Sequence, residues 1–133
     1  MSFELIENAP MHFEFIRKLR NHPQLKIGFI QQDDISALDH ANYMLKYSTQ
    51  YFICLSSGIP VGFIGVVDDD IRLAVDPSFQ NLGVARFMVE EAIKMYPTAQ
   101  AKVKVSNSAS MHLFQSLNFT KEFVIFTQPN SSK

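Results

Sequence analysis

Residues 71–88 read IRLAVDPSFQNLGVARFM, and this stretch decides the fold. Its first five residues are mostly apolar and favour a strand, a proline turn follows, and a helical pattern begins after Gly83. In a strand, loop and helix of this order, the unpaired backbone N–H groups of the helix start can face an anion. Gly83 permits a close backbone approach, and Arg86 adds a positive charge in the first turn.

This stretch matches neither of two common phosphate motifs. It has no Gly-Lys-Ser/Thr, so it is not a Walker loop, and it lacks the glycine triplet of a dinucleotide fingerprint. Taken alone, its hexapeptide QNLGVA, residues 80–85, leaves two equal interpretations. One is an anion site at the helix start, and the other is an ordinary turn into an amphipathic helix.

The elements on both sides predict a single mixed domain. Strands at residues 51–55, 59–67 and 71–75 are separated by turn signals, as in an antiparallel meander. A strand at residues 3–6 and two helices, the second at residues 36–47, precede the meander. A helix that ends at Pro97, a strand at 101–105, a helix at 107–117 and an aromatic strand at 119–126 follow it.

The predicted fold is therefore an α/β (α+β) domain over residues 1–127. It has a mixed, mostly antiparallel sheet with helices on both faces, in the order β-α-α-β-β-β-α-β-α-β. A polar tail at residues 128–133 is expected to fray.

Composition excludes several classes of protein. The 133 residues are 47% hydrophobic with a net charge of −1, which excludes a disordered chain and gives a nucleic-acid partner no electrostatic footprint. No apolar run approaches the roughly 20 residues that span a bilayer, and the first residues do not resemble a signal peptide. The one cysteine, Cys54, lies in an apolar run, which predicts a buried, inert thiol. We expect a cytoplasmic protein.

Residues 71–88 resemble the cofactor-binding segment of GNAT acetyltransferases. In that family, a strand ends in a hydrophobic-x-Pro turn, followed by Gln/Arg-x-x-Gly-x-Gly/Ala and a helix. Residues 105–119, VSNSASMHLFQSLNF, are similar to the second motif of the family, Asn-x-x-Ala/Ser followed by an aromatic residue and Leu-Gly-Phe. Two motifs in the right order and at the right separation are far more specific than either alone.

The resemblance implies that acetyl-CoA is the co-substrate and that no metal takes part. The strand backbone would pair with the pantetheine arm of CoA, the loop and helix start would hold its pyrophosphate, and the second motif would contact pantetheine. Asn107 is equally suited to cap the helix that follows it. The implied cofactor residues are Leu73, Ala74, Val75, Gln80, Asn81, Leu82, Gly83, Val84, Ala85, Arg86, Asn107, Ser110 and Phe114.

Phe114 departs from the family pattern. The family often has a tyrosine there, usually assigned as the acid that protonates the departing CoA thiolate. Phenylalanine has no proton to donate, so this role does not carry over. A thiol of ordinary pKa, about 8.5, is already a tolerable leaving group, and water can protonate it. His112 points to another side of the same helix and is expected to face solvent.

The attacking amine must lose a proton, so a base or a path through water is expected. The candidate catalytic residues are His22, Asp68 and Asp70, with Asp69 and His40 as further titratable groups. For the aspartates the alternative is a solvated turn. For His40 it is an exposed position on the second helix.

A second, less specific resemblance concerns the acceptor. Residues 15–23, FIRKLRNHP, resemble the Leu-Arg-Asn segment of GNAT enzymes that acetylate amino sugars attached to nucleotides, and His40-x-x-Tyr43 fits the same subgroup. This implies that Arg20, Asn21, His22 and His40 bind the acceptor. A helix end with a solvated arginine is an equal interpretation of the segment.

The sequence thus predicts an N-acetyltransferase that moves an acetyl group from acetyl-CoA directly to a primary amine in a ternary complex. The favoured acceptor is an amino-sugar nucleotide, followed by a small polyamine or amino acid, then a protein N-terminus. The alternative is a catalytically silent GNAT-fold module that binds acyl-CoA, which Phe114 favours. The expected partners include neither nucleic acid nor membrane, and the chain is expected to be a monomer or a homodimer.

Overall fold

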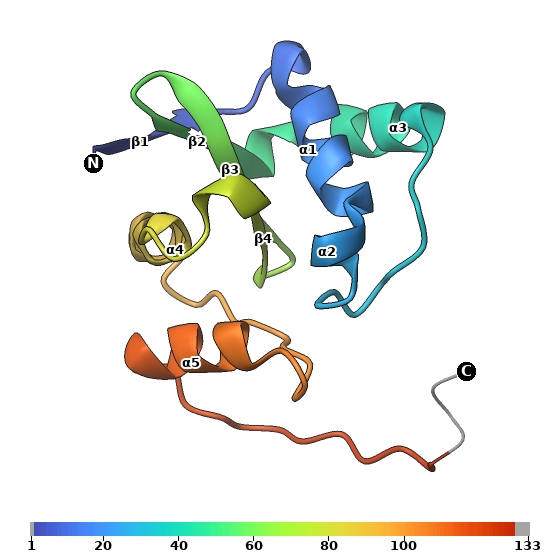
Figure 1. Cartoon of the computed structure of the whole chain (residues 1–133), viewed down its shortest axis with the longest axis vertical. Coiled ribbons are helices and arrows are strands. Elements are labelled where there is room, and N and C mark those ends of the chain that lie inside the picture. Colours follow the sequence, from blue (N-terminus) through green and yellow to red (C-terminus); the bar gives the residue numbers. More distant parts are fainter. Residues whose placement is uncertain (1, 130–133) are drawn as a thin grey trace.

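The computed structural model describes residues 2–129 and contains one four-stranded antiparallel sheet in the order β1-β2-β3-β4 (Figure 1). The strands are β1 (Phe3–Glu7), β2 (Tyr51–Ser56), β3 (Ile59–Val67) and β4 (Asp70–Val75). Two tight turns join β2 to β3 and β3 to β4, and their central residues have positive φ: Ser57 (50°), Gly58 (82°), Asp68 (53°) and Asp69 (62°). Such left-handed two-residue turns suit the twist of hairpin strands. The predicted meander is confirmed.

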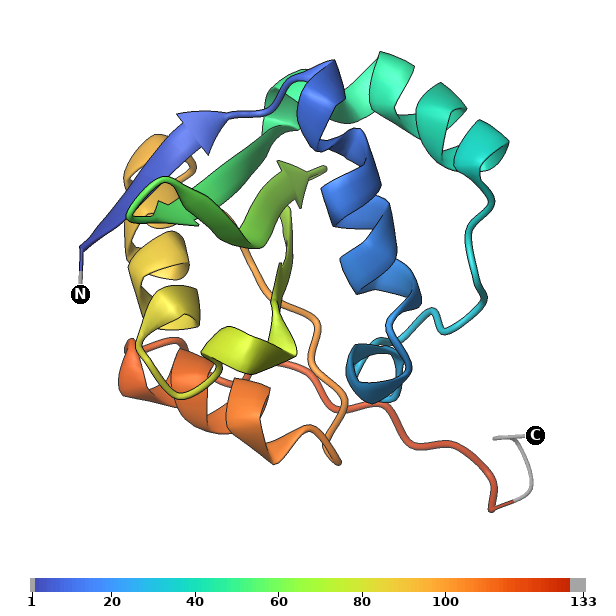
Figure 2. The ribbon, with the colours of Figure 1, turned by 45° about the horizontal axis from the view of Figure 1, so that its top comes forward.

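Helices cover both faces of the sheet (Figure 2). The α-helices are α1 (Phe13–Asn21), α2 (Pro23–Lys26), α3 (Ala37–Tyr47), α4 (Val84–Met95) and α5 (Ser108–Ser116), and short 3₁₀ turns lie at Pro10–His12, Ser48–Gln50 and Pro77–Phe79. Helices α1 and α3 lie on one face and α4 on the other. The predicted single α/β fold with helices on both faces is confirmed.

Alternating strand residues build a separate core on each face. On the side of α1 and α3, Ile16 and Met44 pack with Tyr51 and Phe63. On the side of α4 and α5, the cluster includes Cys54, which is fully buried as predicted. Burial raises the pKa of the Cys54 thiol to about 11, so the thiol is a poor nucleophile at neutral pH.

Two predicted strands are wrong. Residues 101–105 do not form a strand, because only Gln100 pairs with β4, through a parallel bridge to Asp70, before the chain turns away. Residues 119–126 run extended without a neighbouring strand, and Phe123, Ile125 and Phe126 are at least 85% exposed. Their residue types favour a strand, but such a preference depends on a neighbour that completes the backbone hydrogen bonds. Residues 130–133 of the predicted tail lie outside the described part of the chain.

His40 is buried, which corrects the exposed position considered for it. Only 2% of it is accessible, and its Nε2 atom has no hydrogen-bond partner among the described residues. Its ring lies edge-on to Phe13 and stacked beside Tyr43, with centroids 6.5 and 6.4 Å away. Burial, and then the charge of Arg20, lower the pKa of His40 below 6.5.

This burial predicts a pH dependence of stability. Because the pKa of His40 is lower in the folded chain, the unfolded chain takes up the proton first as the pH falls below about 6.5. The free energy of unfolding should therefore decrease in that range, and His40→Phe should remove this part of the decrease. Urea unfolding of both proteins from pH 8 to pH 5 measures it. A wild-type minus variant difference that stays constant over this range would contradict the prediction.

None of the helices at residues 2–129 has the length and apolar character needed to cross a membrane.

Candidate functional site

The main cleft opens along the free edge of β4. The bridge at Gln100 includes a hydrogen bond of 2.8 Å from Ile71 N to Gln100 O, after which the chain diverges from β4. In an antiparallel ladder the N–H and C=O of one residue point to the same edge. The backbone groups of Leu73 and Val75 therefore point, like those of Ile71, toward the open edge, and those of Ala74 toward β3. The resulting cleft has a volume of about 350 Å³.

The two faces of β4 give this cleft two chemically different halves. Side chains of successive strand residues point to opposite faces. Arg72 contacts Tyr43 of α3, which places it and Asp70 on the α1 and α3 side. Ile71 and Leu73 pack on the α4 and α5 side. The cleft passes around the edge of β4 and reaches both.

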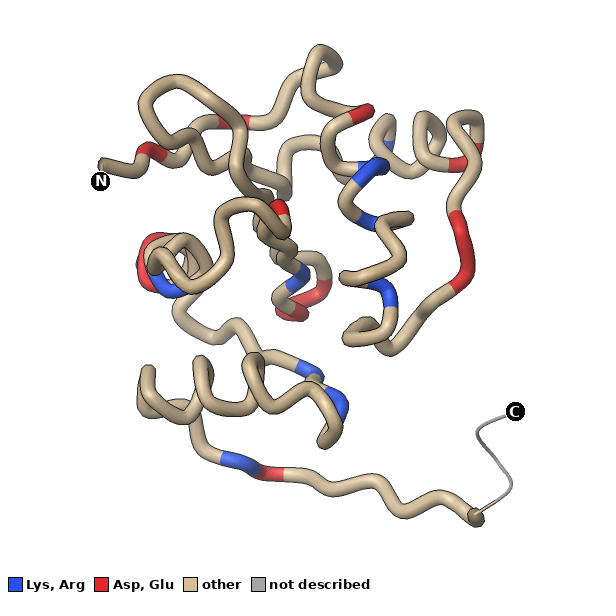
Figure 3. The backbone as a smooth tube through the Cα atoms, viewed as in Figure 1, with Lys and Arg blue, Asp and Glu red and all other residues tan. Residues whose placement is uncertain are grey.

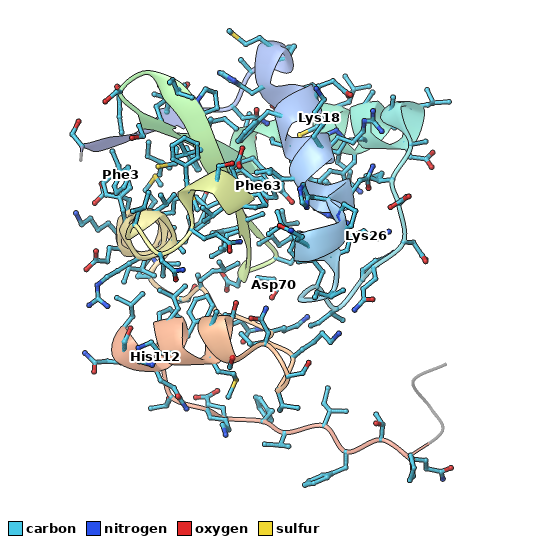
Figure 4. All side chains as sticks on the ribbon, viewed as in Figure 1. Phe3, Lys18, Lys26, Phe63, Asp70 and His112 are labelled. Atoms are coloured by element: carbon cyan, nitrogen blue, oxygen red, sulfur yellow. The ribbon has the colours of Figure 1, made fainter. Side chains whose placement is uncertain are left out.

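Charged side chains line the polar half. Asp70 lies at the end of β4 that faces α5 (Figure 4). Its Oδ1 atom is buried without a hydrogen-bond partner among the described residues, and its Oδ2 atom is 3.7 Å from Arg72 Nε. Arg20 of α1 also lines the cleft and is half-buried. A buried carboxylate oxygen without a partner is costly, which suggests that a ligand donates to it.

Two tyrosines hold Arg72 in place. Arg72 Nη1 donates to the Tyr43 hydroxyl at 2.8 Å, and the hydroxyls of Tyr43 and Tyr51 are also 2.8 Å apart. Burial, and then the contact with Tyr43, raise the pKa of Tyr51, so its hydroxyl keeps its proton. Tyr43 therefore holds the guanidinium of Arg72 in place, and Arg72 lines the cleft.

The apolar half lies between Leu73 and α5. Phe114 is 8% exposed and packs edge-on against Phe119 at 5.1 Å. Ser110, one turn earlier on α5, also lines the cleft. Asn107 caps α5 by accepting from Ser110 N at 3.2 Å, and its Nδ2 atom donates to Gly28 O at 3.2 Å. The cap alternative for Asn107 is therefore correct, and the residue also ties α5 to the loop after α2.

The start of α4 is the segment that the sequence predicts to bind an anion. Gly83, the residue before the helix, has a φ of 87°. It has no side chain that could cap the helix, so no N-cap side chain accepts from the first backbone N–H groups of α4. Residues 80–83 are exposed. Arg86 donates to Ser116 Oγ at 3.1 Å and so joins α4 to α5, with Glu90 3.9 Å away. Backbone N–H groups at a helix start can face an anion, and Arg86 lies in the first turn of this helix.

The structure gathers some of the predicted site residues and separates others. Those that line the cleft are Arg20, Asp70, Leu73, Asn107, Ser110 and Phe114. Asp68 is exposed in the β3–β4 turn, and His112 is exposed on α5 as expected.

Three residues that the sequence predicts to bind the acceptor substrate make structural contacts in the fold. Asn21 holds the backbone of Ile35 through both amide atoms, at 2.9 and 2.8 Å. His22 caps α2 by accepting from Gln24 N at 3.1 Å, and His40 is in the core. None of the three lines the cleft.

Sequence reasoning missed part of the cleft wall. Arg72 is the charged residue inside an otherwise apolar strand, and that contrast could have identified it. The loop residues 28–31 also line the cleft, and so does Lys102. The loop has no periodic pattern that would have marked it.

Comparison with known protein families decides the identity of the fold. The model of the acetyltransferase (GNAT) family matches residues 13–119. The chain belongs to this family. As a GNAT acetyltransferase it uses acyl-CoA as the donor, and the cleft and the uncapped start of α4 suit that co-substrate. No curated protein sequence matches significantly.

Solved structures share this GNAT fold at low sequence identity. A domain from Methanocaldococcus jannaschii is 19% identical, with a TM-score of 0.79 over 91% of this chain and 90% of that one. The spermidine N-acetyltransferase of Vibrio cholerae, solved with CoA and spermine, is 16% identical, with a TM-score of 0.76 over 91% and 82%. An aminoglycoside N-acetyltransferase, solved with CoA, is 20% identical, with a TM-score of 0.69 over 97% and 95%.

The described part of the chain contains no group of three or more His, Cys, Asp or Glu side chains that could hold a metal ion.

Proposed function

We propose that this GNAT enzyme transfers an acetyl group from acetyl-CoA to the primary amine of a small molecule that binds over Asp70. The observation that carries the proposal is Asp70, which lines the cleft and whose buried Oδ1 atom has no hydrogen-bond partner among residues 2–129. An amine donates the hydrogen bond that this oxygen lacks. Asp70 also lies beside the open edge of β4, where the donor is expected.

The chain's own residues have separate roles in this reaction. The open backbone groups of Leu73 and Val75 align the pantetheine arm, and the start of α4 binds the pyrophosphate. Acetyl-CoA supplies an activated thioester. Asp70 accepts a hydrogen bond from the neutral amine and orients it. As nitrogen attacks the carbonyl carbon the C–S bond breaks, and the proton from nitrogen passes through the cleft water to the departing thiolate. Holding both reactants in place supplies much of the acceleration.

Phe114 leaves the departing sulfur without a tyrosine acid. The hydroxyl that the structure offers nearby is that of Ser110, on the same face of α5 and one turn earlier. We propose that Ser110 or water donates to the sulfur, since a thiolate needs little help to leave. The competing function remains a silent acyl-CoA-binding module.

For the acceptor, we favour an amino-sugar nucleotide. Arg20 lines the cleft, as the Leu-Arg-Asn resemblance implies, although Asn21 and His22 do not. Solved structures of this fold include a spermidine N-acetyltransferase bound to CoA and spermine and an aminoglycoside N-acetyltransferase bound to CoA, which supports a small amine as the acceptor. A phosphate-bearing amino sugar agrees better with the two arginines of this cleft.

A combined binding and turnover assay tests the proposed function. We expect acetyl-CoA to raise the melting temperature of the protein, and thiol release to accelerate when amino-sugar nucleotides, polyamines or amino acids are added. The chain's own thiol, Cys54, is buried and adds little background. Stabilisation without thiol release for any amine would favour the silent module. Absence of stabilisation would contradict both functions.

A further inference from the structure

We infer that the acceptor carries an anionic group, a phosphate or carboxylate, besides its amine, and that Arg20 and Arg72 bind this group. The inference rests on the proposed function and specifies its substrate class. Its basis is that the half-buried side chains of Arg20 and Arg72 line the same cleft as Asp70. One carboxylate oxygen of Asp70 has no hydrogen-bond partner among the described residues.

The charge of the cleft is opposite to that of the chain. The chain has a net charge of −1, but the residues that line the cleft include three cations, Arg20, Arg72 and Lys102, and one anion, Asp70. Figure 3 shows basic stretches on α1 and α2, at β4 and on the connection into α5, all bordering the middle of the molecule. Such a cleft attracts anions and repels a ligand whose charges are all positive.

Arg20 is a half-buried cation without a counter-ion among the described residues. Among the described residues, no hydrogen bond or ion pair joins it to another side chain, whereas Arg17, one turn earlier, pairs with Glu14 at 2.7 Å. A partly desolvated charge without a partner costs free energy. An anion in the cleft would offset this cost, because a guanidinium can bind a carboxylate or phosphate through two parallel hydrogen bonds.

Arg72 is fixed in position before a ligand binds. Tyr43 holds its Nη1 atom at 2.8 Å, and Asp70 lies 3.7 Å from its Nε atom. A guanidinium with little freedom to lose on binding recognises an anion more strongly than a mobile one. The neighbouring Asp70 carboxylate would bind the ammonium group of the acceptor. Arg72 and Asp70 together therefore suit a molecule that carries one anionic and one cationic group.

These arginines are separate from the expected phosphate site of CoA. That site is the start of α4, on the face of the sheet that carries α4 and α5. Arg20 and Arg72 lie on the opposite face, with α1 and α3. The donor therefore does not supply their anion, and the acceptor does.

Matched acceptor pairs test the inference. Phosphoethanolamine is compared with ethanolamine, and glucosamine 6-phosphate with glucosamine, with spermidine as the wholly cationic amine. Thiol release at saturating acetyl-CoA gives kcat/KM. We expect the phosphorylated member of at least one pair to react about 10- to 100-fold better, as one charge-assisted hydrogen bond implies, and spermidine to react poorly.

Variants connect this preference to Arg20. In Arg20→Gln the ratio of kcat/KM for the phosphorylated acceptor to that for its uncharged partner should fall about tenfold or more, and Arg20→Lys should retain part of this preference. Lys18→Gln removes the same charge from an exposed position on α1 and should change nothing. Thermal unfolding of each variant checks that the fold is intact.

The outcomes separate the inference from the proposed function. Acetylation of uncharged amines or spermidine at rates equal to or above those of phosphorylated ones would overturn the inference and leave the function standing. The same holds if Arg20→Gln keeps the full preference. Stabilisation by acetyl-CoA without acetylation of any amine would overturn both.

Discussion

Replacing Asp70 by asparagine should lower kcat/KM for the acceptor amine by about 100-fold, with little change in the affinity for acetyl-CoA. An amide of the same shape removes the negative charge that orients the ammonium and accepts its N–H. Losing a positioned group that assists the proton transfer from nitrogen typically costs this much or more. Asp70 lies on the α1 and α3 side of β4 and the expected CoA contacts lie on the other side, so donor binding should persist. Steady-state kinetics with each substrate varied in turn, and CoA titration, measure the two effects.

Two other aspartates make the comparison specific. Asp33→Asn removes the same charge from an exposed loop residue and should leave activity unchanged. Asp68→Asn decides between the two turn carboxylates that the sequence proposed, because Asp68 is exposed outside the cleft and asparagine tolerates its φ of 53°. A loss of activity in Asp68→Asn with full activity in Asp70→Asn would contradict the assignment.

The strand, loop and helix formed by residues 71–88 could be predicted from the sequence, whereas their contacts with CoA stay a prediction. A strand, a loop with Gly83 and a helix are local features, and local turn and helix signals are strong there. The second motif at Asn107 added an independent feature, and the structure brings Asn107, Ser110 and Phe114 to the cleft that Leu73 also lines. The meander was predictable for the same reason, since its turn residues adopt the positive φ that such turns require.

The acceptor half could not be predicted in the same way, because it depends on contacts between distant segments. Asn21 and His22 are adjacent to Arg20, but the helix end directs them to the backbone of Ile35 and Gln24, while Arg20 lines the cleft. Arg72 becomes a site residue only when Tyr43 packs against β4. The predicted strand at 101–105 was wrong because the chain diverges from β4 after Gln100 and so opens the cleft. The strand preferences of the individual residues do not indicate this divergence.

Gly65→Ala should lower the free energy of unfolding by about 1–3 kcal/mol, as overpacking of a tight core does. Gly65 lies opposite Tyr51 in the β2–β3 ladder, and the Tyr51 ring crosses over it. A Cβ atom at Gly65 would lie 2.6 Å from two ring carbons of Tyr51. The fully buried ring cannot move without disturbing Tyr43 and, through it, Arg72. Urea unfolding measures the loss, and acetyl-transfer kinetics should show weaker acceptor binding.

Two comparisons test whether the Tyr51 ring is the cause. Gly58→Asn changes a turn glycine whose added Cβ meets nothing within 4 Å, so it should cost only the backbone strain of a non-glycine residue at a φ of 82°, roughly 1 kcal/mol or less for asparagine, and this cost should not depend on Tyr51. In a double-mutant cycle, Tyr51→Leu should remove most of the cost of Gly65→Ala, because contacting residues are coupled by about 0.5–3 kcal/mol. Additive losses would instead place the strain in the β3 backbone. In that case Tyr51 and Tyr43 would not transmit a change in core packing to Arg72.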